Sequence, residues 1–117
     1  GPAGSSPEVL QMQGLLAPVF KPLGLEVEVL ELTGRGGWRA TLDSGAVIEL
    51  GGGAAQEVVQ RAQRFTRTLT QVAAQYGRRV DALESADLRH SGGYALRLRG
   101  VTTVADGAGV APAVRRR

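Results

Sequence analysis

Hydrophobic residues recur at helical spacing in two parts of the chain. Over residues 54–76 they form one stripe, at intervals of four, three, four, three and four residues. The stripe consists of Val58, Ala62, Phe65, Leu69, Val72 and Tyr76. This spacing predicts a long helix over the range, ended by Gly77. A second helix is predicted over Pro7–Ala17, capped by Ser6 and bent or ended by Pro18.

Between these two helices hydrophobic and polar residues alternate, which is typical of half-buried strands. Alternation over Leu25–Val29 places glutamates on the solvent side. The parity changes at Leu30 and Leu32, which predicts a β-bulge or a second buried face there. A hairpin follows, with strands at Trp38–Leu42 and Ala46–Leu50 joined by a short turn.

The segment Val80–Arg99 reads as a second hairpin, with its turn at His90–Gly93. Beyond it, residues 100–117 have no hydrophobic period and are predicted to be a flexible tail. A strand with nothing folded after it is expected at the rim of its sheet. Its free N–H and C=O groups would then offer a docking site for an extended segment of another protein.

The predicted element order is α-β-β-β-α-β-β, which indicates an α+β fold. We expect a mostly antiparallel sheet of about five strands with two helices. The predicted organisation is one interaction domain over residues 1–99, followed by the tail.

Charge changes this picture little. The chain has 14 Lys and Arg residues against 11 Asp and Glu, a formal net charge of +3. The last three residues are all arginines, and residues 1–114 alone carry 11 basic and 11 acidic residues. The folded part is therefore formally neutral, which argues against a nucleic-acid partner. A small α+β nucleic-acid-binding module remains the alternative, using Arg61, Arg64, Arg67 and the tail.

No pattern in the sequence indicates catalysis. His90 is the only histidine and has no ligand spacing around it, while Asp81, Glu84 and Asp87 lack a nucleophile or a substrate pocket. The glycines at 51–53 lack the Lys-Ser/Thr of a phosphate-binding loop. There is no cysteine, and no apolar stretch approaches the roughly 18 residues of a membrane span. We expect no enzyme activity, cofactor or metal.

The long predicted helix contains R-x-x-R-F, formed by Arg61, Arg64 and Phe65, and a later strand ends in Asp87-Leu88-Arg89. The chain also has a Trp38-x-x-Thr41-Leu42-Asp43-x-Gly45 hairpin and opens with Gly1-Pro2-x-Gly4. Together these motifs resemble the FtsQ/DivIB family of bacterial cell division proteins. The resemblance implies the β domain of a single-pass inner-membrane protein, periplasmic and at the division septum. The anchor and the POTRA domain would then lie outside this chain, which has no initiator Met.

In that family the β domain is a non-enzymatic scaffold that binds FtsB, and with it FtsL. FtsB adds a strand to the last strand of the sheet. Matched position by position, the resemblance implies a partner-binding set of Arg35, Arg89, His90, Gly92, Gly93, Tyr94, Ala95, Leu96, Arg97 and Leu98. Arg89 would meet an acidic partner residue. The family's second arginine falls at Gly36, so Arg35 or Arg39 would replace it.

Overall fold

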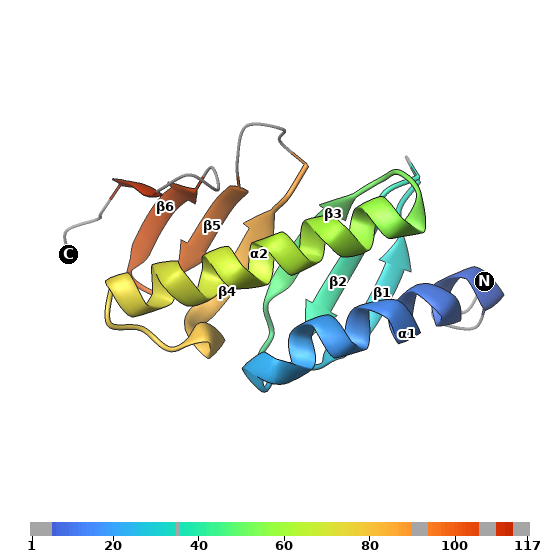
Figure 1. Ribbon diagram of the computed structural model, residues 1–117, viewed down its shortest axis with the longest axis horizontal. Helices are drawn as coiled ribbons and strands as arrows, with labels where there is room; N and C mark the ends of the chain where they lie inside the picture. The colour runs from blue at the N-terminus through green and yellow to red at the C-terminus, as the bar shows by residue number, and fades with distance from the viewer. Residues whose placement is uncertain (1–5, 35, 90–93, 106–109, 114–117) are drawn as a thin grey trace.

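The protein folds as two helices packed on one face of a single sheet, as a computed structural model shows (Figure 1). The structure describes residues 6–34, 36–89, 94–105 and 110–113. Its helices are α1 (Pro7–Phe20) and α2 (Ala55–Gln75), with 3-10 turns η1 (Lys21–Leu23) and η2 (Val80–Ala82). Its strands are β1 (Val27–Leu32), β2 (Trp38–Leu42), β3 (Val47–Gly51), β4 (Leu83–Asp87), β5 (Tyr94–Leu98), β6 (Val101–Ala105) and β7 (Val110–Ala113). The predicted α+β class and its two helices are confirmed.

The strands lie in the sheet in sequence order, β1 to β7. All neighbours pair antiparallel except β3 and β4, which are parallel. The parallel pair is the one that α2 connects, since a crossover is needed to bring the chain back to the same end. In Figure 1, α2 runs across the sheet, and α1 lies beside it.

Helix α1 extends beyond the predicted end at Ala17. Ser6 caps it as expected, because its Oγ accepts a hydrogen bond of 3.1 Å from the Val9 N–H. Pro18 lies inside the helix and does not end it. The next two residues, Val19 and Phe20, are buried, and their burial offsets the hydrogen bond that proline cannot donate.

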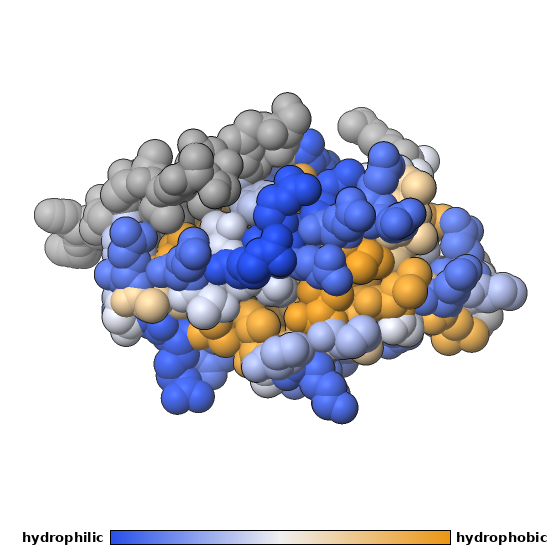
Figure 2. Space-filling view, viewed as in Figure 1, coloured by the Kyte–Doolittle hydropathy of each residue, from blue (hydrophilic) through white to orange (hydrophobic). Residues whose placement is uncertain are grey.

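Helix α2 matches its predicted bounds to within one residue at each end. Its buried face contains Val58, Ala62, Phe65, Leu69 and Val72, five members of the predicted stripe. These side chains pack against the inward residues of the strands and form one core with α1. On this side of the molecule hydrophilic residues cover most of α2, and hydrophobic ones gather between the helices and along α1 (Figure 2).

The first three strands form in the predicted order, but β1 begins at Val27 where the alternation predicts a start at Leu25. The bulge lies between Val27 and Val29, just before the predicted place. It explains why Val27 and Leu30 are both buried although they are three residues apart. Leu32 does not join the core and is 43% exposed.

β4 and β5 pair antiparallel as the predicted hairpin requires, and Tyr94, Leu96 and Leu98 are buried on the inner face. The first strand begins later than predicted, at Leu83, because Val80–Ala82 form the turn η2. The sheet does not end there. β6 pairs with all five residues of β5, and β7 pairs with β6. For residues 101–105 and 110–113, the predicted flexible tail is thus replaced by two further strands. The run Val101-Thr102-Thr103-Val104 is rich in β-branched residues, which favour strands.

Candidate functional site

A groove of about 820 Å³ lies at the end of the sheet where β3 stops and α2 begins. Its lining comes from the loop between β1 and β2, from β2 and β3, from the loop after β3, from α2 and from the segment after β4. The residues that line it are Thr33, Gly34, Gly37, Trp38, Arg39, Glu49, Gly51, Gly52, Arg61 and Arg89. Three arginines therefore line one groove: Arg39 from β2, Arg61 from α2 and Arg89 from the segment after β4.

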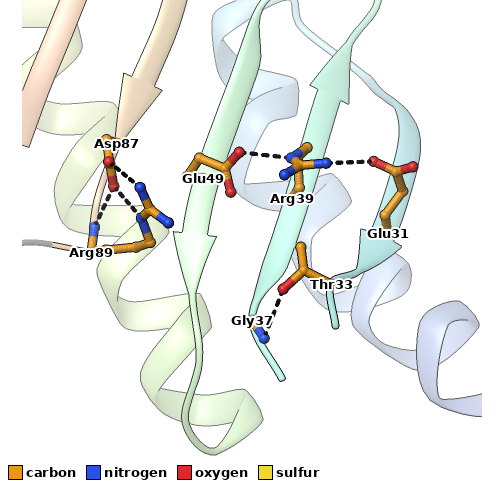
Figure 3. A network of polar contacts seen from close by, with 7 residues as sticks. All are labelled: Glu31, Thr33, Gly37, Arg39, Glu49, Asp87 and Arg89. Atoms are coloured by element: carbon orange, nitrogen blue, oxygen red, sulfur yellow. Dashed lines mark hydrogen bonds and ion pairs between the residues drawn. The ribbon is translucent and has the colours of Figure 1, made fainter. Parts of the chain in front are cut away.

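Arg89 is held at the groove by Asp87, two residues before it. The Asp87 carboxylate accepts hydrogen bonds of 2.9 Å from Arg89 Nε, 2.7 Å from Nη2 and 3.0 Å from the Arg89 backbone N–H (Figure 3). This hydrogen bonding, followed by the charge of Asp87, raises the pKa of Arg89. The preceding N–H, of Leu88, donates to the Glu49 carbonyl at 2.9 Å and continues the parallel ladder to the groove.

Arg39 lies in a row of charged residues on the face of the sheet opposite the helices (Figure 3). Strand register places Glu31, Arg39, Glu49 and Asp87 side by side across four strands. Arg39 Nε donates to Glu49 Oε2 at 2.7 Å, and Nη1 lies 3.6 Å from Glu31 Oε1. The bond to Glu49 is the main cause that raises the pKa of Arg39. Arg39 and Arg89, two of the arginines that the sequence offers as partner contacts, are therefore already ion-paired within the domain.

Arg61 reaches the groove from α2. Its Nη1 donates to the backbone carbonyls of Leu50, at 2.6 Å, and Gly52, at 3.1 Å. Arg61 does not pair with Glu57, which lies one turn before it on the helix. Glu57 Oε1 instead accepts from the Ala54 N–H at 3.0 Å at the start of α2.

Gly51 separates Arg61 from Arg89. Its φ is +82°, and a Cβ there would lie 3.1 Å from Arg61 Nη1 and 3.3 Å from Arg89 Cγ. A side chain at this position would displace one arginine or the other. The run of glycines at 51–53 does not by itself indicate this packing in the sequence. The signal available was the R-x-x-R-F motif, whose first arginine is the one that enters the groove.

The predicted pairing strand, β5, lies at the same end of the molecule as Arg89, since Ala95 is opposite Asp87 in the register. Ala95 and Arg97 are exposed, whereas Tyr94, Leu96 and Leu98 belong to the core and can offer only their main chain. The predicted free edge is wrong for this strand: the backbone of β6 occupies it from Leu98, opposite Val101, to Tyr94, opposite Ala105.

Four predicted site residues, Arg35, His90, Gly92 and Gly93, lie outside the described residues. Within the described parts of the chain, no helix is both long and apolar enough to cross a bilayer. Acidic, histidine and cysteine side chains do not come together there in threes, as a metal site would need. The basic helix face of the nucleic-acid alternative is also reduced, because Arg61 turns toward the groove.

Comparison with known proteins gives a consistent result. Residues 1–89 match the family model of the C-terminal region of the cell division proteins FtsQ/DivIB. The chain is 37% identical over 102 residues to cell division protein FtsQ of Thiomonas arsenitoxydans, covering 86% of this chain and 36% of that protein. It is 32% identical over 97 residues to FtsQ of Nitrosospira multiformis, covering 83% and 39%. FtsQ of Burkholderia pseudomallei is 31% identical over 107 residues, or 91% and 42%. The chain thus spans about two fifths of the length of these relatives.

Proposed function

We propose that this chain, which belongs to the FtsQ/DivIB family of cell division proteins, is a scaffold domain that captures an extended segment of FtsB, together with FtsL. Family membership supports a role in the divisome. The finer proposal is that the segment adds as a strand to β5, while its acidic side chains enter the groove lined by Arg89 and Arg39. We infer a binding role for the domain and no reaction, in keeping with a family of cell division proteins.

The observation that carries the proposal is the alignment of β5 with the groove. The β5 edge is regular enough to pair with a five-residue antiparallel strand, β6. Tyr94 is the β5 residue at the end of the sheet where Arg89 lies. The residue of an added strand that pairs with Tyr94 is therefore at that same end. One partner segment can therefore satisfy both: its backbone bonds to β5, and a flanking carboxylate reaches the arginines.

The incoming strand takes the place of β6. Exchange of one strand for another preserves the backbone hydrogen bonds of β5. Side-chain contacts therefore decide whether β6 or the partner segment pairs with β5 more stably. Residues 101–105 contain no acidic side chain. A partner with a carboxylate next to its strand has an interaction with the groove that β6 lacks, and the exchange then favours the partner.

The family also supports the location that we propose. The domain would lie in the periplasm, as part of a longer protein with a POTRA domain and a single inner-membrane anchor, and would act at the septum. Fractionation of cells that carry the full-length protein, with protease applied to spheroplasts, tests this. Protection of the domain in intact spheroplasts would contradict it.

A reversible cross-link tests strand addition directly. The chain has no cysteine, so Ala95→Cys with Val104→Cys creates a single disulfide between opposite residues of β5 and β6. We expect the reduced double variant to bind the soluble segment of FtsB from the same organism in calorimetric titration. The oxidised form should bind at least about tenfold more weakly, because β6 cannot leave.

The control is a single variant, Ala95→Cys, treated with the same oxidant. Equal affinity of the oxidised and reduced double variants would reject strand addition at β5. Absence of binding by the reduced form and by the unmodified chain, up to high micromolar concentrations, would reject FtsB as the partner.

A further inference from the structure

Of the three arginines in the groove, Arg61 alone has no carboxylate partner among the described residues. Arg89 is paired with Asp87, and Arg39 with Glu49 and Glu31. Arg61 donates only to two backbone carbonyls. We propose that Arg61 is the anion-binding side chain of the groove, and that it receives a carboxylate of an acidic peptide segment. This inference rests on the proposed function and identifies its main charge contact.

The hydrogen bonds of Arg61 leave its binding edge available. Nη1 uses its donors on the carbonyls of Leu50 and Gly52. The Nε and Nη2 groups have no partner in the part of the chain that the structure describes, and together they form the edge that binds a carboxylate through two parallel hydrogen bonds. Because Nη1 is anchored to the β3 end of the sheet, the guanidinium plane is fixed before any ligand arrives, and less side-chain entropy is lost on binding.

Charge favours Arg61 over its neighbours. A carboxylate that approaches Arg89 must compete with the two Asp87 oxygens, which already accept from Nε and Nη2. At Arg39 it must compete with Glu49. At Arg61 no carboxylate of the described residues competes, because its hydrogen bonds go to the Leu50 and Gly52 carbonyls. The partner carboxylate therefore gains most at the residue that sequence comparison did not assign.

Two other arginines of α2 supply matched controls. Arg64 and Arg67 are exposed, lie on the same helix, and are not part of the groove lining. Removal of either charge changes the net charge of the domain as much as removal of Arg61 does. A loss of binding that is confined to position 61 therefore reports the groove and not general electrostatic attraction.

The first experiment measures the affinity for the FtsB segment at several salt concentrations. For Arg61→Gln, which keeps a donor for the carbonyls but no charge, we expect at least about tenfold weaker binding and a shallower salt dependence. Arg61→Lys should retain part of the affinity, and Arg64→Gln should stay within about twofold of the unmodified chain. Folded Arg61→Gln protein with unchanged affinity and salt dependence would overturn the proposal, as would an equal loss in Arg64→Gln.

The second experiment needs neither a variant nor FtsB. Hexaglutamate peptide is titrated into the unmodified 15N-labelled chain, and the Nε–Hε signals of the arginines are followed by NMR. We expect the Nε–Hε signal of Arg61 to shift and to reach saturation, whereas the signals of Arg64 and Arg67 should show no saturable shift. Absence of a selective Arg61 shift overturns the inference. If hexaglutamate shifts Arg61 but the FtsB segment does not bind, the acidic-peptide site stands and the proposed partner fails.

Discussion

Asp87 holds Arg89 through both of its carboxylate oxygens, at 2.9 Å from Nε and 2.7 Å from Nη2. The two residues flank Leu88 at the end of β4, so a local ion pair fixes the arginine at the mouth of the groove. The contact has a cost for recognition, because the same oxygens occupy the edge with which Arg89 would bind a ligand. Arg89 is therefore well placed at the groove, but its guanidinium edge is not free to bind a ligand.

The pH dependence of partner binding follows from the raised pKa values of Arg89 and Arg39, caused mainly by hydrogen bonds to Asp87 and Glu49. A raised pKa of a cation adds stability that is fully present below the unfolded-state pKa and is lost only as pH rises through the folded-state pKa. For arginine both values lie far above the physiological pH range. We expect affinity to stay constant between about pH 8 and pH 10 in calorimetric titration. A fall within this interval would show that a group other than these arginines carries the contact.

Gly51→Ala should destabilise the domain by about 2 kcal/mol, as measured by urea unfolding. The new Cβ meets Arg61 Nη1 at 3.1 Å in addition to the strain of a φ of +82°. Gly24→Ala is the matched control: its φ is +76° and a Cβ there meets nothing within 4 Å. It should cost about 1 kcal/mol from backbone strain alone. Equal losses in the two variants would mean that the arginines move aside freely.

Tyr94→Phe should stabilise the domain by about 1 kcal/mol. Tyr94 is 5% exposed, and its hydroxyl has no hydrogen-bond partner among the described residues. The ring packs edge-on against Phe65, with centroids 5.9 Å apart, and phenylalanine keeps that contact. Urea unfolding measures the change. A loss of stability would reveal a bond to the hydroxyl that the described residues do not supply.

Much of the fold could be predicted because its elements have strong, regular patterns. The hydrophobic stripe of α2 fits a helix and no strand, and the alternation in β2, β3 and β5 identifies the buried side chains correctly. The end of α1 could not be predicted from Pro18, since the burial of Phe20 depends on distant partners. The site was harder still. Arg89 follows from a local motif, but the position of Arg61 depends on carbonyls of Leu50 and Gly52, about ten residues away in sequence, and no periodicity encodes that contact.

Pro18→Ala tests how the core overrides a local helix breaker. Pro18 is exposed within α1, so the substitution removes no buried surface and restores a backbone N–H donor. We expect a gain of about 1–2 kcal/mol in the free energy of unfolding, smaller than the cost of proline in a helix because alanine also frees the unfolded chain. Thermal and urea unfolding should agree. An unchanged stability would indicate that the helix is already locally distorted to accommodate the ring.

Removal of residues 101–117 should increase affinity for the FtsB segment. The buried core described for this chain runs from Val9 to Leu98, so the shortened domain keeps it and should stay folded. Apparent affinity is reduced by the fraction of molecules in which the site is closed. If β6 occupies β5 nine-tenths of the time, its removal strengthens binding by roughly tenfold.

Removal of residues 114–117 alone takes away the same three terminal arginines and leaves β6 in place, which makes it the control. Equal affinity of the two shortened chains would show that β6 does not compete with the partner, whereas a gain only in the shorter one would identify β6 as the occupant that the partner replaces.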